Sequence, residues 1–482
     1  MTFSSNKRCL LIVAALLAWL TVHAPARSAD NVLLIAVDDL RNCSGAFGDP
    51  LAKTPHIDAL AKRGTVFRNA HCQIAICNPS RASMMTGLRP DTIKVWGLSK
   101  HFRDEKPDVV TLPQLFKQNG YFTHSIGKIY HGLGRPSKDP PSWSDDPELD
   151  HVTKRDAYVL KENRTGGKAA ATERADVADN EHVDGQVADA AVRKLRQLAG
   201  SGKPFLLAVG FRKPHLPFAA PAKYWGWYDR TDLAEPSFAR MPGGAPEIAG
   251  HDWRELRGYT DVPDDGPIAP EKIAELRHGY YAATSFVDAQ IGRVLDELKR
   301  LRLDRKTTIV LYGDHGFHLG EQDLWGKLTN YDTATRAPLL IAHPAQKDKG
   351  AVIDRAVEFL DIYPTLAELC GLKPPAALEG ESLAKALDDR NAEVKEFAIS
   401  QFPRPVSYDF TGRPPRNMGY SIRNQFYRYT RWVDFATGEL LAEEFYDLKP
   451  GTIERKNEIA NPDYSELVER LKQQLERVTG AF

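Results

Sequence analysis

The chain has 482 residues, of which 42% are hydrophobic and 27% are charged. That hydrophobic fraction is ordinary for a globular protein and excludes a disordered chain. Lys plus Arg and Asp plus Glu number 64 each, so the formal net charge is zero. Nucleic-acid binders usually carry a basic excess, so no nucleic-acid partner is expected. Five cysteines are too few for a fold built on disulfides.

Residues 1–29 are typical of a secretory signal peptide. Lys7 and Arg8 precede an apolar run from Cys9 to about Val22, and small residues follow. The run is too short for a comfortable bilayer span, although an uncleaved amino-terminal anchor is the alternative. We therefore expect an exported protein, periplasmic or secreted (lysosomal in a eukaryote), with no stable membrane insertion after signal cleavage.

The mature chain retains four cysteines. Cys77 belongs to a motif considered below, which leaves Cys43, Cys72 and Cys370. One disulfide among these three and buried free thiols are both compatible with the sequence, which does not choose between them.

Four continuous apolar runs predict strands buried on both faces. They are residues 31–37, 204–210, 307–312 and 338–342. Helical patterns lie between them, and the clearest is an apolar stripe from Ile273 to Leu298. Strands that alternate with helices predict an α/β fold, a three-layer αβα sandwich with a mostly parallel central sheet.

The remaining segments predict insertions and a second unit. Residues 136–150 and 166–180 are polar and predict surface insertions, and 230–270 predicts a long excursion beside a site. Beyond Pro374-Pro375 the segments become short and aromatic, with a final amphipathic helix. We therefore expect a catalytic domain at 30–375 and a smaller C-terminal subdomain at 376–482, with a short antiparallel sheet and a terminal helix.

Two acidic groups follow predicted strands. Asp38 and Asp39 leave the first strand, where adjacent carboxylates are costly unless a cation neutralises them. Asp314 and His315 follow the 307–312 strand and offer an oxygen and a nitrogen ligand. A solvated turn is the alternative for each group alone. Ligands of open α/β sheets bind at the carboxyl ends of strands, so we expect the groups to converge.

A third group lies at the start of a predicted helix. Pro79 suits the first helical turn, which places Cys77 at the positive end of the helix dipole. That position depresses a thiol pKa and attracts an anion, and Arg81 lies one turn further along. A packed structural cysteine is the alternative for an isolated Cys.

The complete string is far more specific. Cys77-x-Pro79-Ser80-Arg81, followed by Thr86-Gly87, resembles the signature of the type I sulfatases of the alkaline phosphatase-like superfamily. In that family a formylglycine-generating or anaerobic sulfatase-maturating enzyme oxidises the cysteine to formylglycine (3-oxoalanine), whose aldehyde hydrate is the nucleophile. The resemblance therefore implies a maturation enzyme as a partner.

The resemblance also implies a cofactor, one divalent cation that is usually Ca²⁺. Its implied ligands are Asp38, Asp39, Cys77, Asp314 and His315. Imidazole is an unusual ligand for calcium, because hard cations prefer oxygen. The sequence thus leaves open which metal binds and whether His315 contacts it.

Several basic residues complete the resemblance. Each one alone is a surface base or a satisfied histidine. In the family pattern Arg81, Lys128 and Lys327 stabilise charge on the transferring sulfuryl group. His215 or Lys327 protonates the departing sugar oxygen, and His131 accepts the proton whose loss expels sulfate. These roles are implied by the resemblance and not by spacing.

Details point to the iduronate 2-sulfatase branch. Asp314-His315, 319–321 and 419–423 resemble that branch, whereas Phe317 and 323–324 depart from it. We expect a sulfatase that acts on a carbohydrate, with a 2-O-sulfated uronic acid of a glycosaminoglycan or other sulfated polysaccharide as the favoured substrate.

A uronic carboxylate would need a further base, for which Arg212, Lys213 and Arg404 are candidates. Three alternatives remain at this point: a sulfatase of another sugar or small sulfate ester, a phosphoester hydrolase of the same superfamily, and an inactive carbohydrate-binding relative.

Overall fold

The computed structural model describes residues 31–132, 138–252, 254–375, 378–406, 413–449 and 452–480. The predicted signal peptide lies outside these ranges. None of the helices within them has both the length and the apolar character needed to cross a lipid bilayer.

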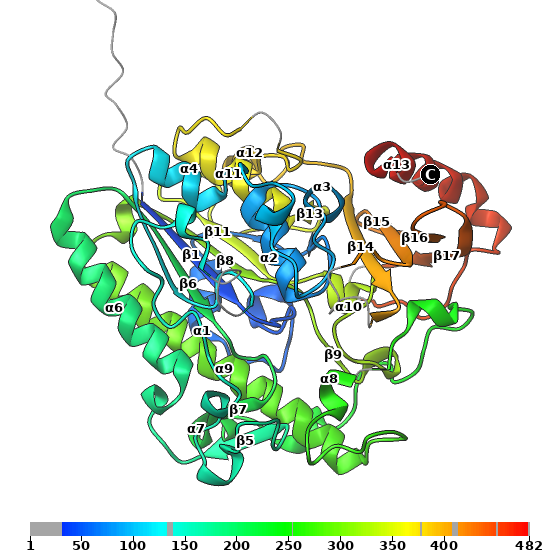
Figure 1. The fold of residues 1–482 in the computed structure, drawn as a ribbon, viewed down its shortest axis with the longest axis horizontal. Coiled ribbons are helices and arrows are strands. Elements are labelled where there is room, and N and C mark those ends of the chain that lie inside the picture. The colour runs from blue at the N-terminus through cyan, green and yellow to red at the C-terminus, as the bar shows by residue number, and fades with distance from the viewer. Residues whose placement is uncertain are drawn as a thin grey trace, which may run out of the picture.

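A seven-stranded sheet forms the centre of the molecule (Figure 1). Its strands, in spatial order, are β12 (Ala351–Ile353), β2 (Thr65–Phe67), β11 (Leu339–Ala342), β8 (Thr307–Gly313), β1 (Asn31–Val37), β6 (Phe205–Phe211) and β4 (Phe122–Gly127). β11 is antiparallel to β2 and β8, and the other pairings are parallel. The predicted mostly parallel sheet is confirmed, and the reversal at β11 was not indicated by its apolar run.

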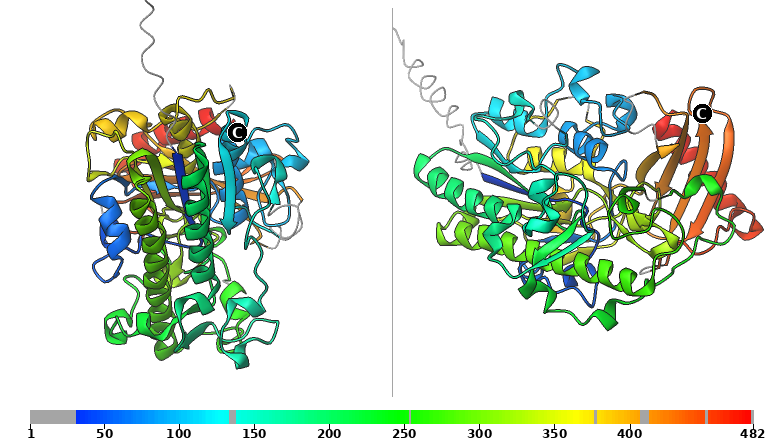
Figure 2. Two further views of the ribbon diagram at one scale, coloured as in Figure 1. Left: turned by 90° about the vertical axis from the view of Figure 1, so that its left-hand side faces the viewer. Right: turned by 60° about the horizontal axis from the view of Figure 1, so that its bottom comes forward.

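Helices cover both faces, because alternate residues of β1 contribute to different hydrophobic cores. Leu33, Ile35 and Val37 pack with α1 (Pro55–Ala61), α6 (Val183–Ser201) and α9 (Pro270–Arg300). Val32, Leu34 and Ala36 face the core that contains α2 (Cys77–Thr86), α4 (Leu112–Gln118) and α11 (Ile362–Leu369). Figure 2 shows α6 and α9 running along one face of the sheet. The three-layer sandwich is therefore confirmed.

A second sheet lies beside the sandwich, on the right in Figure 1. It is antiparallel and consists of β14 (Ala398–Arg404), β15 (Asn417–Arg423), β16 (Tyr427–Asp434) and β17 (Leu440–Asp447). The final helix, α13 (Ser465–Thr479), buries Leu471 and Leu475 against it. The predicted short antiparallel sheet and terminal helix are thus present.

Shorter elements connect these layers. They are β3 (Ala70–His71), α3 (Pro90–Ile93), β5 (Thr172–Ala175), β7 (Phe218–Pro221), α7 (Ala222–Trp225), α8 (Arg254–Arg257), β9 (His318–Leu319), β10 (Trp325–Gly326), α10 (Asp332–Thr335), β13 (Val357–Glu358) and α12 (Ala384–Asp388).

Two predicted surface insertions are partly wrong. Within 166–180, β5 pairs in parallel with β7. Within 136–150, Trp143 is buried and Glu148 bridges to Ile126 at the edge of the central sheet. A few apolar side chains in these polar stretches are buried against the rest of the protein, which composition alone does not reveal.

The cysteines are free thiols. Cys43 and Cys72 are buried in separate hydrophobic clusters, and Cys370 is half-buried. The described residues therefore contain no disulfide among these three.

A buried ion cluster joins the C-terminal sheet to α10. Arg428 of β16 donates to Glu454 at 2.8 Å and also to Asp332 of α10. Arg423 of β15 donates to Asp332 at 2.9 Å. Arg428, Asp332 and Glu454 are each at most 1% exposed. The C-terminal sheet is thereby anchored to α10, which follows Lys327 closely in the sequence.

We expect Arg428→Leu to lower the free energy of unfolding by about 3–5 kcal/mol, because it leaves buried carboxylates without a partner. Urea denaturation would measure the loss. The exposed Arg477→Leu is the matched control and should change stability by less than about 0.5 kcal/mol. An equal effect in both variants would contradict a structural role for the cluster.

Candidate active site

Four neighbouring strands, β4, β6, β1 and β8, end at one edge of the central sheet. The residue after each strand is charged, and these are Lys128, Arg212, Asp38 and Asp314. Close packing at this edge requires Gly210, because a Cβ there would lie 2.0 Å from the Lys128 carbonyl oxygen. Parallel register therefore brings four charges from distant parts of the chain together.

Helix α2 delivers Cys77 to the same edge. Cys77 is its first residue, as predicted, and all ten residues of the helix are buried. Arg81, one turn on, donates through Nε to Asp314 at 2.8 Å and through Nη2 to Asp38 at 3.0 Å. This guanidinium bridges two strands and fixes the helix against the sheet.

Cys77, Asp39, Asp314 and His315 converge. Cys77 Sγ lies 3.4 Å from His315 Nε2 and 3.8 Å from Asp39 Oδ1. His315 Nε2 is 3.3 Å from Asp39 Oδ1 and 3.7 Å from Asp314 Oδ1. Asp39 has a φ of 58°, a left-handed conformation that Asp tolerates better than most residues.

This donor set fits a divalent cation. His315 Nδ1 faces the Gly316 carbonyl oxygen at 2.9 Å, so the ring proton belongs on Nδ1 and the Nε2 lone pair faces the carboxylates. Carboxylates from Asp38, Asp39 and Asp314 supply the oxygen atoms that hard cations prefer. An imidazole nitrogen with several carboxylates is compatible with more than one metal.

The predicted bases surround these acids. Lys128 donates to Asp38, and Lys327 Nζ donates to Asp39 Oδ2 at 2.8 Å. His215 Nε2 lies 3.8 Å from Asp39 Oδ2. His131 lines the adjoining cavity, and its buried Nδ1 has no hydrogen-bond partner among the described residues. All ten residues predicted from the sequence therefore border one region of the structure.

Burial and charge set the protonation states. Burial opposes protonation of Lys327, but Asp39 and Glu255 raise its pKa well above the usual value. Burial lowers the pKa of His131 well below its ordinary range, and Lys128 adds to this shift. The position of Cys77 at a helix start predicted a depressed thiol pKa, but burial raises that pKa, with a further contribution from Asp38.

Sequence reasoning missed Glu255 of α8. Its carboxylate lies 3.2 Å from Lys327 Nζ and 3.4 Å from His215 Nε2. Burial raises its pKa, but Lys327 and His215 outweigh that effect and lower it to about 2. The only signal in the sequence was that the 230–270 excursion was predicted to lie beside a site.

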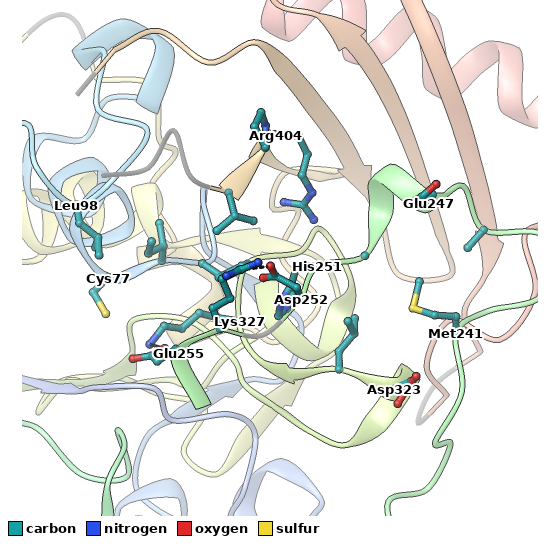
Figure 3. Close-up of a pocket in the computed structure, with 18 of the residues that line it drawn as sticks. Cys77, Leu98, Met241, Glu247, His251, Asp252, Glu255, Asp323, Lys327 and Arg404 are labelled. Atoms are coloured by element: carbon teal, nitrogen blue, oxygen red, sulfur yellow. Dashed lines mark hydrogen bonds and ion pairs between the residues drawn. The ribbon is translucent and has the colours of Figure 1, made fainter. Parts of the chain in front are cut away.

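A cavity of about 1250 Å³ opens on Cys77 (Figure 3). In Figure 3 Lys327 and Glu255 lie near the cysteine, and Met241, Glu247 and Asp323 lie at the far end. Arg404 of β14 also lines it and donates to the carbonyl oxygens of Ile248 and Ala249. The excursion, the 323–328 segment and the C-terminal sheet thus build the walls together.

Comparisons with known proteins agree on one family. The family profile described as "Sulfatase" matches residues 30–372, and the profile "N-sulphoglucosamine sulphohydrolase, C-terminal" matches residues 320–481. Iduronate 2-sulfatase of Mus musculus is 34% identical over 491 residues, with 89% of each chain covered. Iduronate 2-sulfatase of Homo sapiens is 33% identical, with 88% of each covered.

Solved structures share the fold. A phosphonate monoester hydrolase from Silicibacter pomeroyi has a TM-score of 0.76 at 24% identity, covering 93% of this chain and 94% of that one. A structure described as a 2-O GAG sulfatase has a TM-score of 0.68 at 23% identity, covering 93% and 91%. At these identities the likeness concerns the fold alone.

We expect Ca²⁺ to raise the Tm of the protein, because a ligand bound only by the folded state stabilises it by about 2.7 kcal/mol at 100 times Kd. Asp39→Asn and Asp314→Asn should each abolish the shift. Asp354→Asn, which removes an exposed partner of Arg68, is the control and should retain it. Thermal unfolding with and without the ion measures the shift, and an unchanged shift in Asp39→Asn and Asp314→Asn would exclude these ligands.

Proposed function

The chain belongs to the sulfatase family and is a sulfate ester hydrolase, and on this premise we propose that it removes the 2-O-sulfate of a uronic acid in a glycosaminoglycan or a related sulfated polysaccharide. The convergence of Cys77 with three buried carboxylates and two lysines supports ester hydrolysis at this site. The identity of 34% to an iduronate 2-sulfatase, over 89% of the chain, supports the choice of sugar.

The proposed reaction needs a converted cysteine side chain and a metal ion. Cys77 is converted to formylglycine by a maturation enzyme, and the converted side chain supplies the attacking oxygen. Asp38, Asp39, Asp314 and His315, with the converted Cys77, would hold one divalent cation, proposed to be Ca²⁺, which supplies positive charge to the ester oxygens.

The remaining residues bind charge and move protons. Lys128 and Lys327 hold their protons, so both offer positive charge to the sulfate oxygens. His215 donates from Nδ1 to the Leu216 carbonyl at 2.7 Å, which leaves Nε2 toward the site. We assign leaving-group protonation to Lys327 or to His215 in its doubly protonated form, because only that form carries a proton on Nε2. His131, whose pKa is lowered, is assigned as the base that accepts the proton when sulfate departs.

We propose export to the periplasm or outside the cell, or to a lysosome in a eukaryote, from the signal pattern of residues 1–29. We also propose the division into a catalytic domain at 30–375 and a C-terminal subdomain at 376–482. All seven strands of the central sheet precede residue 354, and the antiparallel sheet begins at Ala398.

Mass spectrometry of the Cys77 peptide from the native host should show the aldehyde in place of the thiol. Cys77→Ala should reduce sulfatase activity to background, because it removes the group that is converted. Cys370→Ala, at a half-buried thiol outside the site, is the control and should keep its activity. An unmodified Cys77 in fully active protein would refute the formylglycine assignment.

Matured protein should release sulfate from a 2-O-sulfated uronate disaccharide with at least about tenfold higher kcat/KM than from a 6-O-sulfated hexosamine, a difference of about 1.4 kcal/mol. An aryl sulfate and the matching aryl phosphate, assayed side by side, test the ester class. A preference for the phosphate would favour a phosphoester hydrolase instead.

A further inference from the structure

A second, smaller cavity adjoins the sulfate-binding groups. Its volume is about 280 Å³, and it shares Lys168, His215 and Glu255 with the larger cavity. Asp38 and Lys128 also line it, whereas Cys77 lines only the larger one. The small cavity therefore lies directly beside the proposed catalytic groups but is not the space that faces the nucleophile.

Three cations in its wall are at least partly buried and have no carboxylate of the described residues within ion-pair distance. Lys213 Nζ donates to the carbonyl oxygens of His215 and Pro217, the latter at 2.5 Å. Arg212 Nη2 donates to the Asp150 carbonyl at 2.7 Å, and its buried Nε has no hydrogen-bond partner. Lys168 donates to the Glu255 carbonyl oxygen. Among the described residues, no carboxylate lies within ion-pair distance of these three side chains.

The carboxylates in the same wall are already engaged. Asp184 accepts the backbone N–H groups of Arg212 at 2.9 Å and Lys213 at 2.7 Å. Asp38 pairs with Arg81 and Lys128, Glu255 pairs with Lys327, and Asp156 pairs with Arg164 at 3.5 Å. The three cations therefore have acidic side chains nearby, such as Asp184, Asp38 and Glu255, but no direct ion pair among the described residues, and a buried cation without a direct partner is costly.

An unsatisfied histidine lines the same cavity. His182 is 4% exposed, and its Nε2 has no hydrogen-bond partner among the described residues. Buried polar atoms are nearly always hydrogen-bonded, so this nitrogen points to a missing ligand or water. Burial also lowers the pKa of the neighbouring Lys213 to about 8, because the cost of desolvating its ammonium group exceeds the opposing effect of Asp184 and the other nearby carboxylates.

We propose that this cavity, defined by Lys168, His182, Arg212 and Lys213, binds an oxyanion other than the sulfate under attack. The chemistry fits two sources, a carboxylate of the substrate sugar and the inorganic sulfate that the reaction releases. The inference rests on the proposed function, because only a sulfatase supplies both anions at this place.

The test uses matured protein with Arg212→Gln, Lys213→Met and Lys168→Met, and with the exposed Lys203→Met as the matched control. The first arm compares kcat/KM for a 2-O-sulfated uronate disaccharide, its carboxyl-reduced counterpart and an aryl sulfate. The second arm measures the number and affinity of inorganic sulfate ions bound, by calorimetry, which does not require turnover. Thermal unfolding confirms that each variant is folded. If Arg212→Gln or Lys213→Met does not fold, Lys168→Met, at a less buried side chain, is used for both arms.

If the carboxylate occupies the cavity, the variants lose about 10- to 100-fold in kcat/KM on the uronate but keep their activity on the carboxyl-reduced and aryl substrates. If released sulfate occupies it, the variants lose one of two bound sulfate ions and the uronate discrimination is unchanged. Either result supports the proposal. Variants that match Lys203→Met in both arms would overturn it.

Failure of the proposed function has a different signature. A wild-type protein that hydrolyses the aryl sulfate but not the uronate would refute the substrate, while sulfate binding in the variants would still report on the cavity. A wild-type protein without sulfatase activity, but with a sulfate site lost in Arg212→Gln, would refute the proposed function and keep the anion site.

Discussion

Three carboxylates buried at one edge of a sheet require opposing positive charge, and the architecture of the site follows from that requirement. Arg81 contacts Asp38 and Asp314, which leave strands that are neighbours in space but far apart in sequence. A guanidinium presents a rigid fork of donors, so one side chain reaches both acids. Because Arg81 belongs to α2, its ion pairs hold this buried helix against the sheet. Cys77, the first residue of the helix, therefore lies beside the buried carboxylates.

Two lysines neutralise the buried carboxylates and also line the cavities. Lys128 and Lys327 balance Asp38 and Asp39, and both also face cavities. A lysine held by a buried carboxylate keeps its proton and its position, so its positive charge is oriented without any ligand. Glu255 extends this pattern, because it contacts Lys327 and His215 from the cavity side. The carboxylates that could bind a metal cation therefore also hold in place the basic side chains that could bind an anion.

The larger cavity is assembled from segments outside the central sheet. The excursion that carries Glu255, the segment around Lys327 and Arg404 of the C-terminal sheet all contribute to its walls. The buried cluster of Arg428, Asp332 and Glu454 links the last two of these segments. The C-terminal sheet thus contributes, through Arg404, to the wall of the cavity that opens on Cys77.

The sequence by itself determined the features that depend on neighbouring residues. Apolar runs predicted the strands, and the Cys77 motif and the charged strand ends predicted the reaction, because each signal lies within a few consecutive positions. Tertiary structure alone decided the reversal of β11 and the pairing of Glu255 with Lys327. It also decided which cavity each of the additional basic residues lines. The sequence offered Arg212, Lys213 and Arg404 as equals, whereas folding placed Arg404 at the larger cavity and the other two at the smaller one. These outcomes depend on which distant segments line the same cavity and which charged side chains form ion pairs there. A local sequence pattern contains neither kind of information.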